Sequence, residues 1–334
     1  MSDPKSVLVV QTAYLGDTVF TSALVASLAA RWPSARIELC VSPRGRDVAL
    51  AMPAAAAVHV FDKRGTARRL AGLRRMAMVL RERKFDLAVL PHRSLRTALL
   101  ARLARIPERV GFSGTLPSLL YTARVASSQR GFLDREADLG RHFGATPQPM
   151  RLLPRPEWID AARATLSEAS DHPLAGICLG SEWETKIWPE QRMAELAVSL
   201  RERGYRPVLL GGPRERATAR EIASATDCLD TTGNSIGEAL AILSFCSLAV
   251  GGDTGLVHAA RALSVPTVAL FGPTTPAVHH FGERELAVSL DLSCSPCSAH
   301  GSRRCPLGHH RCLRDLDAAR VATACLQVAR KGAA

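Results

Sequence analysis

Residues 250–276 read VGGDTGLVHAARALSVPTVALFGPTTP, and this stretch decides the fold. The apolar run that ends at Val250 is followed by a glycine pair and Asp253, after which apolar residues recur at the spacing of a short helix. A second apolar run, Thr267–Phe271, ends in Gly272-Pro273. The order strand, glycine loop, helix, strand is a βαβ unit, which predicts a parallel sheet.

The loop of this unit has the chemistry of an anion site. The first N–H groups of a helix lack partners within the helix, and the helix dipole favours negative charge at the same end. Asp253-Thr254-Gly255 opens the predicted helix, and His258 follows one turn later on the side that faces the loop. On these residues alone a structural interpretation stays open, in which Asp253 caps the helix and His258 is a buried, hydrogen-bonded histidine.

The length and composition favour a globular chain of two domains. The chain has 334 residues, 47% hydrophobic and 22% charged, and single cores stop growing at about 250–300 residues. No apolar run approaches the roughly 20 residues that span a bilayer, and the first residues lack a signal-peptide pattern. These features predict a cytoplasmic protein, whose nine cysteines are expected as thiols or metal ligands rather than disulfides.

The net charge of +12 lies on the first half of the chain. Residues 1–150 hold 23 Lys and Arg against 11 Asp and Glu, whereas residues 151–334 hold 20 of each. The densest basic stretch, residues 63–84, is interpreted as a solvated helix face, as a surface for an anionic lipid or membrane, or as a nucleic-acid site. Aromatic content is only 5% and no recognition motif for DNA or RNA is present, so no nucleic-acid partner is expected.

Short apolar runs alternate with helical patterns along the whole chain. This predicts two doubly wound α/β domains, residues 1–155 and 173–334, joined by a linker helix within residues 156–172. The first domain has no G-x-G-x-x-G fingerprint, so an NAD site lacks its main support. Asp17, between the first strand and a helix predicted from Thr18, either caps that helix or is a carboxylate at the sheet edge where such sheets bind ligands.

Four loops that follow predicted strands carry polar residues. In a doubly wound sheet the strand ends before such loops meet at one edge. Lys186 precedes a predicted helix start, where positive charge is unfavourable, so it is either an exposed loop lysine or the partner of an anion such as phosphate. The loops contain Gly16-Asp17, Gly180-Ser181 with Lys186, Gly212-Pro213 with Glu215, and residues 251–258.

These loops resemble those of the glycosyltransferase family 9 heptosyltransferases. The similar segments are LGDTVFTSALVASLAARWP from residue 15, GSEWETKIWP from 180, GGPRE from 211 and GGDTGLVHAARALSVPTVALFGPTTP from 251, in the family's order and spacing. The resemblance covers nearly the whole chain. It implies a GT-B fold, in which two Rossmann-like domains face each other across a cleft, the first for the acceptor and the second for the nucleotide sugar.

The resemblance also implies a role for each loop residue. Asp17 would be the general base that takes the proton of the acceptor hydroxyl. The donor would be bound by Lys186 at the pyrophosphate, Glu215 at the ribose and Asp253 at the heptose. Three consecutive residues, Thr254, Gly255 and Leu256, would offer backbone N–H groups to phosphate with His258 beside them, and Ser181 would line the phosphate loop. That loop departs from the family pattern at Leu179, where proline is usual.

The implied reaction is an inverting transfer of L-glycero-D-manno-heptose from ADP-heptose to the inner core of lipopolysaccharide. One base and a stabilised leaving group suffice for it, so no cofactor is expected for catalysis. The one Asp-x-Asp, Asp315-Leu316-Asp317, is better explained as a helix cap. The implied acceptor is an anionic lipid-linked core, which suits the basic first half and predicts peripheral contact with the inner face of the inner membrane.

Two alternatives stay open. The first keeps this fold and mechanism with another nucleotide-sugar donor and a different glycan or lipid acceptor. The second, which is less favoured because it leaves the four loops without a role, is a basic zinc-containing nucleic-acid-binding protein.

A cysteine cluster near the C-terminus is the second chemical signal, and its CSPC…CPLGHHRC pattern is similar to the second heptosyltransferase of the pathway. Ligand type and spacing permit a tetrahedral structural zinc site, with a loop of reduced thiols as the alternative. The four cysteines are Cys294, Cys297, Cys305 and Cys312, accompanied by His309-His310. The other five lie in apolar contexts and are predicted to be core: Cys40, Cys178, Cys228, Cys246 and Cys325.

Overall fold

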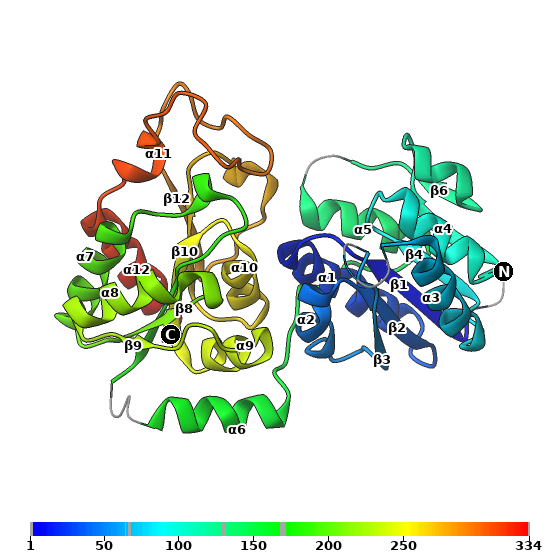
Figure 1. Cartoon of the computed structure of the whole chain (residues 1–334), viewed down its shortest axis with the longest axis horizontal. Helices are drawn as coiled ribbons and strands as arrows, with labels where there is room; N and C mark the ends of the chain where they lie inside the picture. Colours follow the sequence, from blue (N-terminus) through cyan, green and yellow to red (C-terminus); the bar gives the residue numbers. More distant parts are fainter. Residues whose placement is uncertain (1–2, 64, 66–67, 129–130, 168–171, 333–334) are drawn as a thin grey trace. The chain divides into compact units, whose positions relative to one another are not determined.

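The computed structural model describes residues 3–63, 65, 68–128, 131–167 and 172–332. The chain divides into two compact units, Met1–Leu153 and Pro154–Ala334. Each unit is an α/β domain with helices packed on a six-stranded sheet (Figure 1). The predicted α/β class is therefore confirmed for both halves of the chain.

The sheet of the first unit is parallel throughout, with the order β3-β2-β1-β4-β5-β6. Its central strands are buried because helices cover both faces of a parallel sheet, whereas its two edge strands are half-buried or partly exposed. The strands are β1 (Ser6–Gln11), β2 (Arg36–Val41), β3 (Ala57–Val60), β4 (Leu87–Leu90), β5 (Glu108–Phe112) and β6 (Ala123–Val125). The α-helices are α1 (Leu15–Arg31), α2 (Arg46–Leu50), α3 (Leu70–Glu82), α4 (Leu95–Leu103) and α5 (Phe132–His142).

The sheet of the second unit is also parallel, with the order β12-β11-β10-β7-β8-β9. Its strands are β7 (Leu174–Cys178), β8 (Arg206–Leu210), β9 (Leu229–Asp230), β10 (Cys246–Gly252), β11 (Thr267–Phe271) and β12 (Glu285–Ser289). Its α-helices are α6 (Pro156–Thr165), α7 (Glu190–Arg201), α8 (Arg216–Thr226), α9 (Ile236–Ser244), α10 (Gly255–Ala262), α11 (Arg311–Arg314) and α12 (Ala318–Gly332). A short 3₁₀ turn, η4 (Glu184–Lys186), precedes α7.

The two sheets share one topology. In each, the first strand in the chain lies beside the second and the fourth, so the winding direction reverses between the first and the fourth strand. The loops that follow these two strands run in opposite directions. Ligands of open α/β sheets bind in the crevice between such loops. This switch point lies after β1 and β4 in the first unit, and after β7 and β10 in the second.

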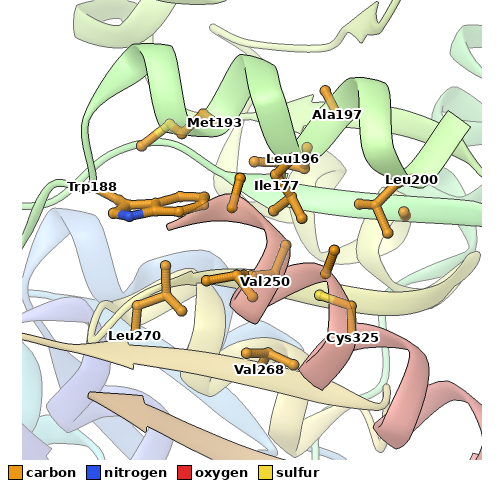
Figure 2. Packing of buried hydrophobic residues seen from close by; sticks show 14 of the residues in the cluster. Ile177, Trp188, Met193, Leu196, Ala197, Leu200, Val250, Val268, Leu270 and Cys325 are labelled. Atoms are coloured by element: carbon orange, nitrogen blue, oxygen red, sulfur yellow. The ribbon is translucent and has the colours of Figure 1, made fainter. Parts of the chain in front are cut away.

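The largest core of the second unit lies where α7 and α12 cover one face of its sheet (Figure 2). Trp188 is buried at the end of this core beside Leu270, and its indole Nε1 donates a hydrogen bond to the carbonyl of Leu316 at 3.1 Å. That bond satisfies the polar edge of the ring, so the ring can stay buried without cost. Because Lys186 stands two residues before Trp188, this core also anchors the turn that carries Lys186.

The helix predicted as a linker, α6, packs on the second unit. A Cβ atom at Gly237 of α9 would lie 2.4 Å from the ring of Trp158, so only glycine lets the two helices approach this closely. Ala162 of α6 is buried in the same cluster. Residues 168–171, where the sequence predicts the end of this helix, lie outside the described residues.

The first helix begins earlier than its sequence predicts. α1 starts at Leu15 rather than Thr18, because Tyr14 is the extended residue that precedes it. Asp17 therefore lies inside the first turn, where its Oδ2 accepts a hydrogen bond from the Tyr14 N–H at 3.2 Å. The interpretation of Asp17 as the residue capping a helix from Thr18 is wrong.

Two other local predictions, the Asp-x-Asp cap and the buried cysteines, are confirmed. Asp317 caps α12 by accepting the N–H of Arg320 at 2.7 Å, as expected for the Asp-x-Asp. All five cysteines predicted as core are buried. Among the described helices, none is long and apolar enough to cross a membrane.

Candidate active site

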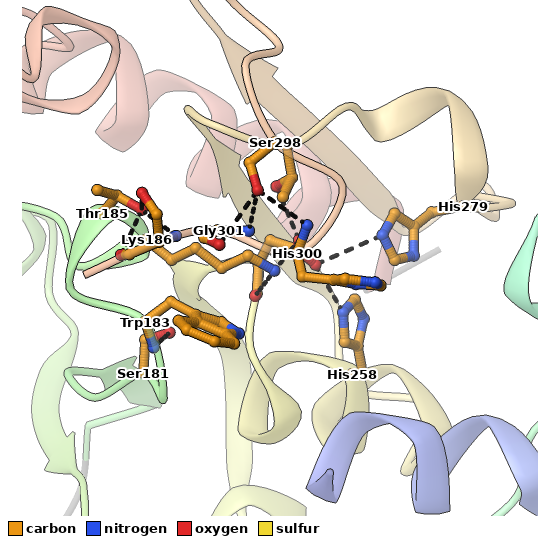
Figure 3. Close-up of polar contacts among 12 residues, drawn as sticks. Ser181, Trp183, Thr185, Lys186, His258, His279, Ser298, His300 and Gly301 are labelled. Carbon is orange, nitrogen blue, oxygen red and sulfur yellow. Dashed lines mark hydrogen bonds and ion pairs between the residues drawn. The ribbon is translucent and has the colours of Figure 1, made fainter. Parts of the chain in front are cut away.

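A buried ion pair occupies the switch point of the second unit. Lys186 Nζ lies 2.6 Å from Asp253 Oδ2 and also donates to the Asp253 carbonyl at 3.1 Å. Figure 3 shows the Lys186 side chain reaching toward His258 and His279, which lie on the other side of the same carboxylate. Gly252 permits the approach, because a Cβ atom there would lie 2.2 Å from the Lys186 carbonyl oxygen.

Each oxygen of the Asp253 carboxylate has its own partners. Oδ2 accepts from Lys186 and, at 2.8 Å, from the Thr274 hydroxyl. Oδ1 lies 2.9 Å from His258 Nε2 and 3.4 Å from His279 Nε2. Burial alone would raise the pKa of this carboxyl, but the two histidines and the charge of Lys186 together lower it well below its usual range. Asp253 is therefore a fixed negative charge.

The tautomer of His258 follows from its second partner. Arg261 Nη1 lies 3.3 Å from His258 Nδ1, and because a guanidinium can only donate, Nδ1 must be the accepting nitrogen. The ring proton is then on Nε2, where it is donated to Asp253. Burial lowers the pKa of His258 to about 4, so the ring is neutral. His258 thus holds the Asp253 carboxylate in one orientation.

The same three side chains have the composition of a metal site. Among the described residues, Asp253, His258 and His279 form the one group of three or more potential ligands whose ligand atoms all lie within 4.8 Å of one another. A metal on His258 Nε2 would have to displace the proton that the contact with Arg261 fixes there. The arrangement therefore suits a hydrogen-bonded carboxylate better than a metal centre.

The N-terminus of α10 opens beside this carboxylate. Thr254 is the extended residue that precedes the helix, so the N–H groups of Gly255 and Leu256 begin its first turn. The Thr254 hydroxyl is buried and has no hydrogen-bond partner within the described part of the chain. A buried hydroxyl and unpaired N–H groups at a helix N-terminus can all donate to an anion.

Glu215 and Ser181 lie at the adjacent strand ends. Glu215 Oε2 accepts the N–H of Gly212 at 2.7 Å. A Cβ atom at Gly180 would lie 2.6 Å from the Glu215 carboxyl carbon, so this carboxylate lies between the loops that follow β7 and β8. The Ser181 hydroxyl accepts the N–H of Trp183 at 3.1 Å and so shapes the turn that leads to Lys186.

The cysteine-containing loop braces the Lys186 turn. Thr185 exchanges hydrogen bonds with Ser302, with Thr185 Oγ1 donating to the Ser302 carbonyl at 2.9 Å and accepting the Ser302 N–H at 2.9 Å. His310 Nε2 donates to the Thr185 carbonyl at 2.8 Å. Gly301 lies close to Lys186, because a Cβ atom there would be 3.2 Å from the lysine Cε (Figure 3). The loop is thus part of the site's support.

The four cysteines of this loop differ in environment. Hydrogen bonds from successive backbone N–H groups, the largest contribution coming from His310, lower the pKa of Cys305. Burial and the neighbouring thiols raise the pKa of Cys297 and Cys312. The four sulfurs influence one another electrostatically, yet within the described residues they do not form a ligand group of the closeness that Asp253, His258 and His279 have.

Asp17 lies at the switch point of the first unit. It lines a cavity of about 150 Å³ together with residues that follow β1 and β4 and residues of α5. The cavity has aromatic, acidic and basic walls that include Phe132, Arg93 and Arg135. The structure therefore brings the predicted donor-site residues together in the second unit and places the predicted base in a separate cavity of the first.

Sequence reasoning missed several residues of both sites. Thr274 lies in the GPTTP tail of the opening stretch, which was a usable signal. No pattern pointed to Thr185, His279 or Glu136, because each reaches its site only through the tertiary fold. The sequence predicts an anion such as phosphate as a partner of Lys186. In the structure the Asp253 carboxylate of the same chain is that partner.

Two Rossmann-like units with polar loops at the carboxyl ends of their strands are the architecture of GT-B glycosyltransferases. The sequence profile of glycosyltransferase family 9 (heptosyltransferase) matches residues 73–307. The chain belongs to this family and is a glycosyltransferase, which confirms the resemblance and the fold predicted from it.

Individual relatives agree with this assignment. The chain is 31% identical to lipopolysaccharide heptosyltransferase 2 of Salmonella typhimurium over 292 residues, 81% of this chain and 83% of that one. It superposes on the structure of Escherichia coli ADP-heptose lipopolysaccharide heptosyltransferase II with a TM-score of 0.81 and 25% identity, covering 98% and 100% of the two chains. A family 9 glycosyltransferase from Veillonella parvula gives a TM-score of 0.87 at 23% identity, with 98% of each chain covered.

Proposed function

We propose that the protein transfers L-glycero-D-manno-heptose, with inversion, from ADP-heptose to the inner core of lipopolysaccharide. The observation that carries the proposal is the buried Lys186–Asp253 pair beside the N-terminus of α10, in a chain related to heptosyltransferases. This pair combines a cation and an anion at the sheet edge where a nucleotide sugar would bind.

The geometry supports a phosphate role for Lys186. Two of its three ammonium hydrogens are donated to Asp253 Oδ2 and to the Asp253 carbonyl. The third is available to a phosphate oxygen, as are the Thr254 hydroxyl and the N–H groups of Gly255 and Leu256. As ADP leaves, its developing negative charge would be stabilised by these donors without a catalytic metal ion.

The remaining donor groups follow from position. Asp253, whose orientation is fixed by His258, would accept hydroxyl hydrogens of the heptose through lone pairs that its present partners leave open. Glu215, between the loops after β7 and β8, would accept the ribose hydroxyls, and Ser181 would line the phosphate loop. The first unit would bind the acceptor, and Asp17 would take the proton of the attacking hydroxyl.

The experiment that tests this function is a transfer assay with ADP-heptose and lipopolysaccharide from a strain that lacks the activity. We expect a mass increase of one heptose in the core oligosaccharide, and an anomeric configuration opposite to that of the donor. An acceptor that gains no heptose while ADP-heptose is bound would contradict the proposal.

A different nucleotide-sugar donor is the main alternative, because no residue described above reads the base. Calorimetric titration with ADP, GDP and UDP, each with and without Mg²⁺, separates the two. Metal-independent preference for ADP is expected. Preference for GDP or UDP would keep the site and overturn the named sugar.

Helix α3 supports a peripheral contact with the inner face of the inner membrane, and with it a cytoplasmic location. Its inner face is buried through Leu73, Ala77 and Leu80, whereas Met78 is 59% exposed and shares the outer face with the exposed Arg74. Apolar and basic side chains on one helix face suit a surface of anionic lipid. We expect co-sedimentation with phosphatidylethanolamine vesicles only when they contain phosphatidylglycerol.

The cysteine loop would hold a structural zinc ion through Cys294, Cys297, Cys305 and Cys312. The residues fit, since four thiols are a complete tetrahedral set and Cys305, with its lowered pKa, is already inclined to the thiolate form. Bound zinc would fix the loop that braces Lys186. Elemental analysis is expected to find about one zinc per chain, lost in Cys305→Ser; protein free of metal would contradict the assignment.

A further inference from the structure

Glu136 is a buried acidic residue in the same cavity as Asp17. It projects from α5, is 7% exposed, and lines the cavity of about 150 Å³ at the switch point of the first unit. One of its oxygens, Oε2, is buried and has no hydrogen-bond partner within the described part of the chain. A buried carboxylate oxygen without a partner is costly, and protonation of the carboxyl group lowers that cost.

The other oxygen belongs to a network centred on Thr21. Thr21 Oγ1 lies 3.0 Å from Gln11 Nε2, 3.0 Å from the Asp17 carbonyl oxygen and 3.1 Å from Glu136 Oε1. Gln11 Oε1 accepts the N–H of Ala13, which fixes the amide so that its nitrogen faces Thr21. A hydroxyl has one hydrogen to donate and can accept two.

Counting hydrogens in this network places a proton on Glu136. The Asp17 carbonyl can only accept, so it receives the Thr21 hydrogen, while the Gln11 amide fills one lone pair of the hydroxyl. With Glu136 ionised, Thr21 would have to donate to both the Asp17 carbonyl and Glu136 Oε1, and one hydrogen cannot serve both, so we assign the proton of the second contact to Glu136.

We propose that Glu136 is an uncharged positioning residue of the acceptor cavity: its carboxyl proton is donated to Thr21, and its side chain forms part of the wall against which the acceptor sugar binds. Only the contact with the acceptor sugar rests on the proposed function. Through Thr21 the same proton holds the first turn of α1, which carries Asp17, and it keeps a second negative charge away from the base.

The charged surroundings agree with the neutral state. Burial raises the pKa of Glu136 to about 8, and the nearby Asp17 carboxylate adds to this, against the opposing effects of Thr21 and Arg135. Arg93 and His92 line the same cavity, and burial with the charge of Lys63 lowers the pKa of His92 to about 4. The carboxyl is therefore expected to ionise only as pH rises through about 8.

The test compares Glu136→Gln with Glu136→Ala in the full chain. Glutamine can donate to Thr21 and fill the same part of the cavity wall as the neutral acid does. With lipopolysaccharide from a strain that lacks the activity as acceptor, we expect Glu136→Ala to raise the acceptor KM about 3- to 10-fold. Glu136→Gln should recover most of that loss, and the dissociation constant of ADP should not change in either variant. Wild-type acceptor KM should rise as pH passes about 8, and that rise should be absent from Glu136→Gln.

Two readouts separate failure of this inference from failure of the proposed function. An infrared difference spectrum between wild type and Glu136→Gln at pH 7 should contain a carboxylic-acid C=O band, whether or not transfer occurs. Without that band, Glu136 is ionised and the inference is overturned. If the band is present but Glu136→Ala leaves the acceptor KM unchanged, the sugar contact is wrong, and if Glu136→Gln fails as badly as Glu136→Ala, the neutral-acid role is wrong.

Discussion

Asp253 and Glu136 are the same kind of group in the two halves of the molecule, yet their proton affinities are shifted in opposite directions. Each is a carboxyl group at 7% exposure, at the switch point of a six-stranded parallel sheet. Asp253 has Lys186, Thr274 and two histidines around it, and its pKa is lowered despite burial. Glu136 has one hydroxyl neighbour and an unpartnered oxygen, and burial raises its pKa to about 8.

The partners of a buried acid, rather than its depth in the fold, therefore decide whether it is charged. In the second unit the charge is fixed by a cation, which suits the proposed binding of a charged donor. In the first unit a neutral acid leaves Asp17 as the proposed base of its cavity. Five substitutions test this contrast, beginning with the one that is expected to change the protein most.

Asp253→Asn should have the largest effect. It leaves the Lys186 ammonium buried without a counter-charge, which typically costs about 3–5 kcal/mol of the free energy of unfolding. Urea denaturation at pH 7 measures it. The matched control is Asp227→Asn, which removes an ion pair with Arg201 and Arg206 at a carboxylate that is 63% exposed, and should cost about 1 kcal/mol or less. Equal losses of stability in the two variants would mean that the buried Lys186–Asp253 pair contributes no more than an exposed ion pair.

Gly252→Ala tests the close approach of β10 to the Lys186 turn. The new Cβ atom would meet the Lys186 carbonyl oxygen at 2.2 Å, so the backbone must move. Overpacking of this kind costs about 1–3 kcal/mol, and ADP affinity should fall with it because Lys186 shifts. Gly282→Ala is the control, since its Cβ atom would have its nearest neighbour at 3.9 Å. Unchanged ADP affinity in Gly252→Ala would show that Lys186 does not need this position.

His258→Gln tests the fixed charge through pH. At pH 7 the lost hydrogen bonds should cost about 1–3 kcal/mol of the free energy of unfolding. The ordinary pKa of histidine is 6.5 and burial lowers that of His258 to about 4, so the unfolded chain takes up this proton first. The stability advantage of wild type over the variant should therefore shrink as pH falls from about 6.5 to about 4. A constant advantage would contradict the neutral tautomer.

For Glu136 in the first unit, stability should change with pH in the direction opposite to that expected for His258. Because the pKa of Glu136 is raised, the folded chain holds its proton more tightly than the unfolded chain. The stability of wild type relative to Glu136→Gln should therefore fall as pH rises from about 4.5 to about 8. If stability changes with pH in the same direction for His258 and Glu136, the contrast between the two units is wrong.

Thr185→Val should have the smallest effect. It removes the hydroxyl that joins the Lys186 turn to Ser302 of the cysteine loop, which should cost about 0.5–1.5 kcal/mol per hydrogen bond lost. Thr323→Val, at an exposed helical position, is the control and should change stability by less than about 0.5 kcal/mol. If both variants behave alike, the cysteine loop does not brace the Lys186 turn.

The fold could be predicted from the sequence because its signals are local. Apolar runs of strand length, helical periodicity and glycine loops recur along the chain, and each depends only on residues that are close in the sequence. The Asp253 loop was found in the same way, because its residues are consecutive. The start of α1 was placed three residues late, since Tyr14 is not a residue that usually precedes a helix.

The partners across the fold could not be predicted. His279 reaches Asp253 from a loop after β11, and Glu136 meets Thr21 although the two stand far apart in the sequence. No spacing rule joins such residues, since their contact depends on how helices pack on the sheet. Lys186 shows the same limit, because its need for an anion was evident while the identity of that anion was not.

The measurement that tests the account most directly is the activity of Asp17→Asn. Asparagine keeps the shape of the side chain and can still accept the Tyr14 N–H, but it cannot take a proton. We expect kcat to fall about 10²- to 10⁴-fold while the dissociation constant of ADP stays that of wild type, because the proposed base and the proposed donor site belong to different units. A variant that turns over at the wild-type rate would contradict it, and the base would have to be sought elsewhere.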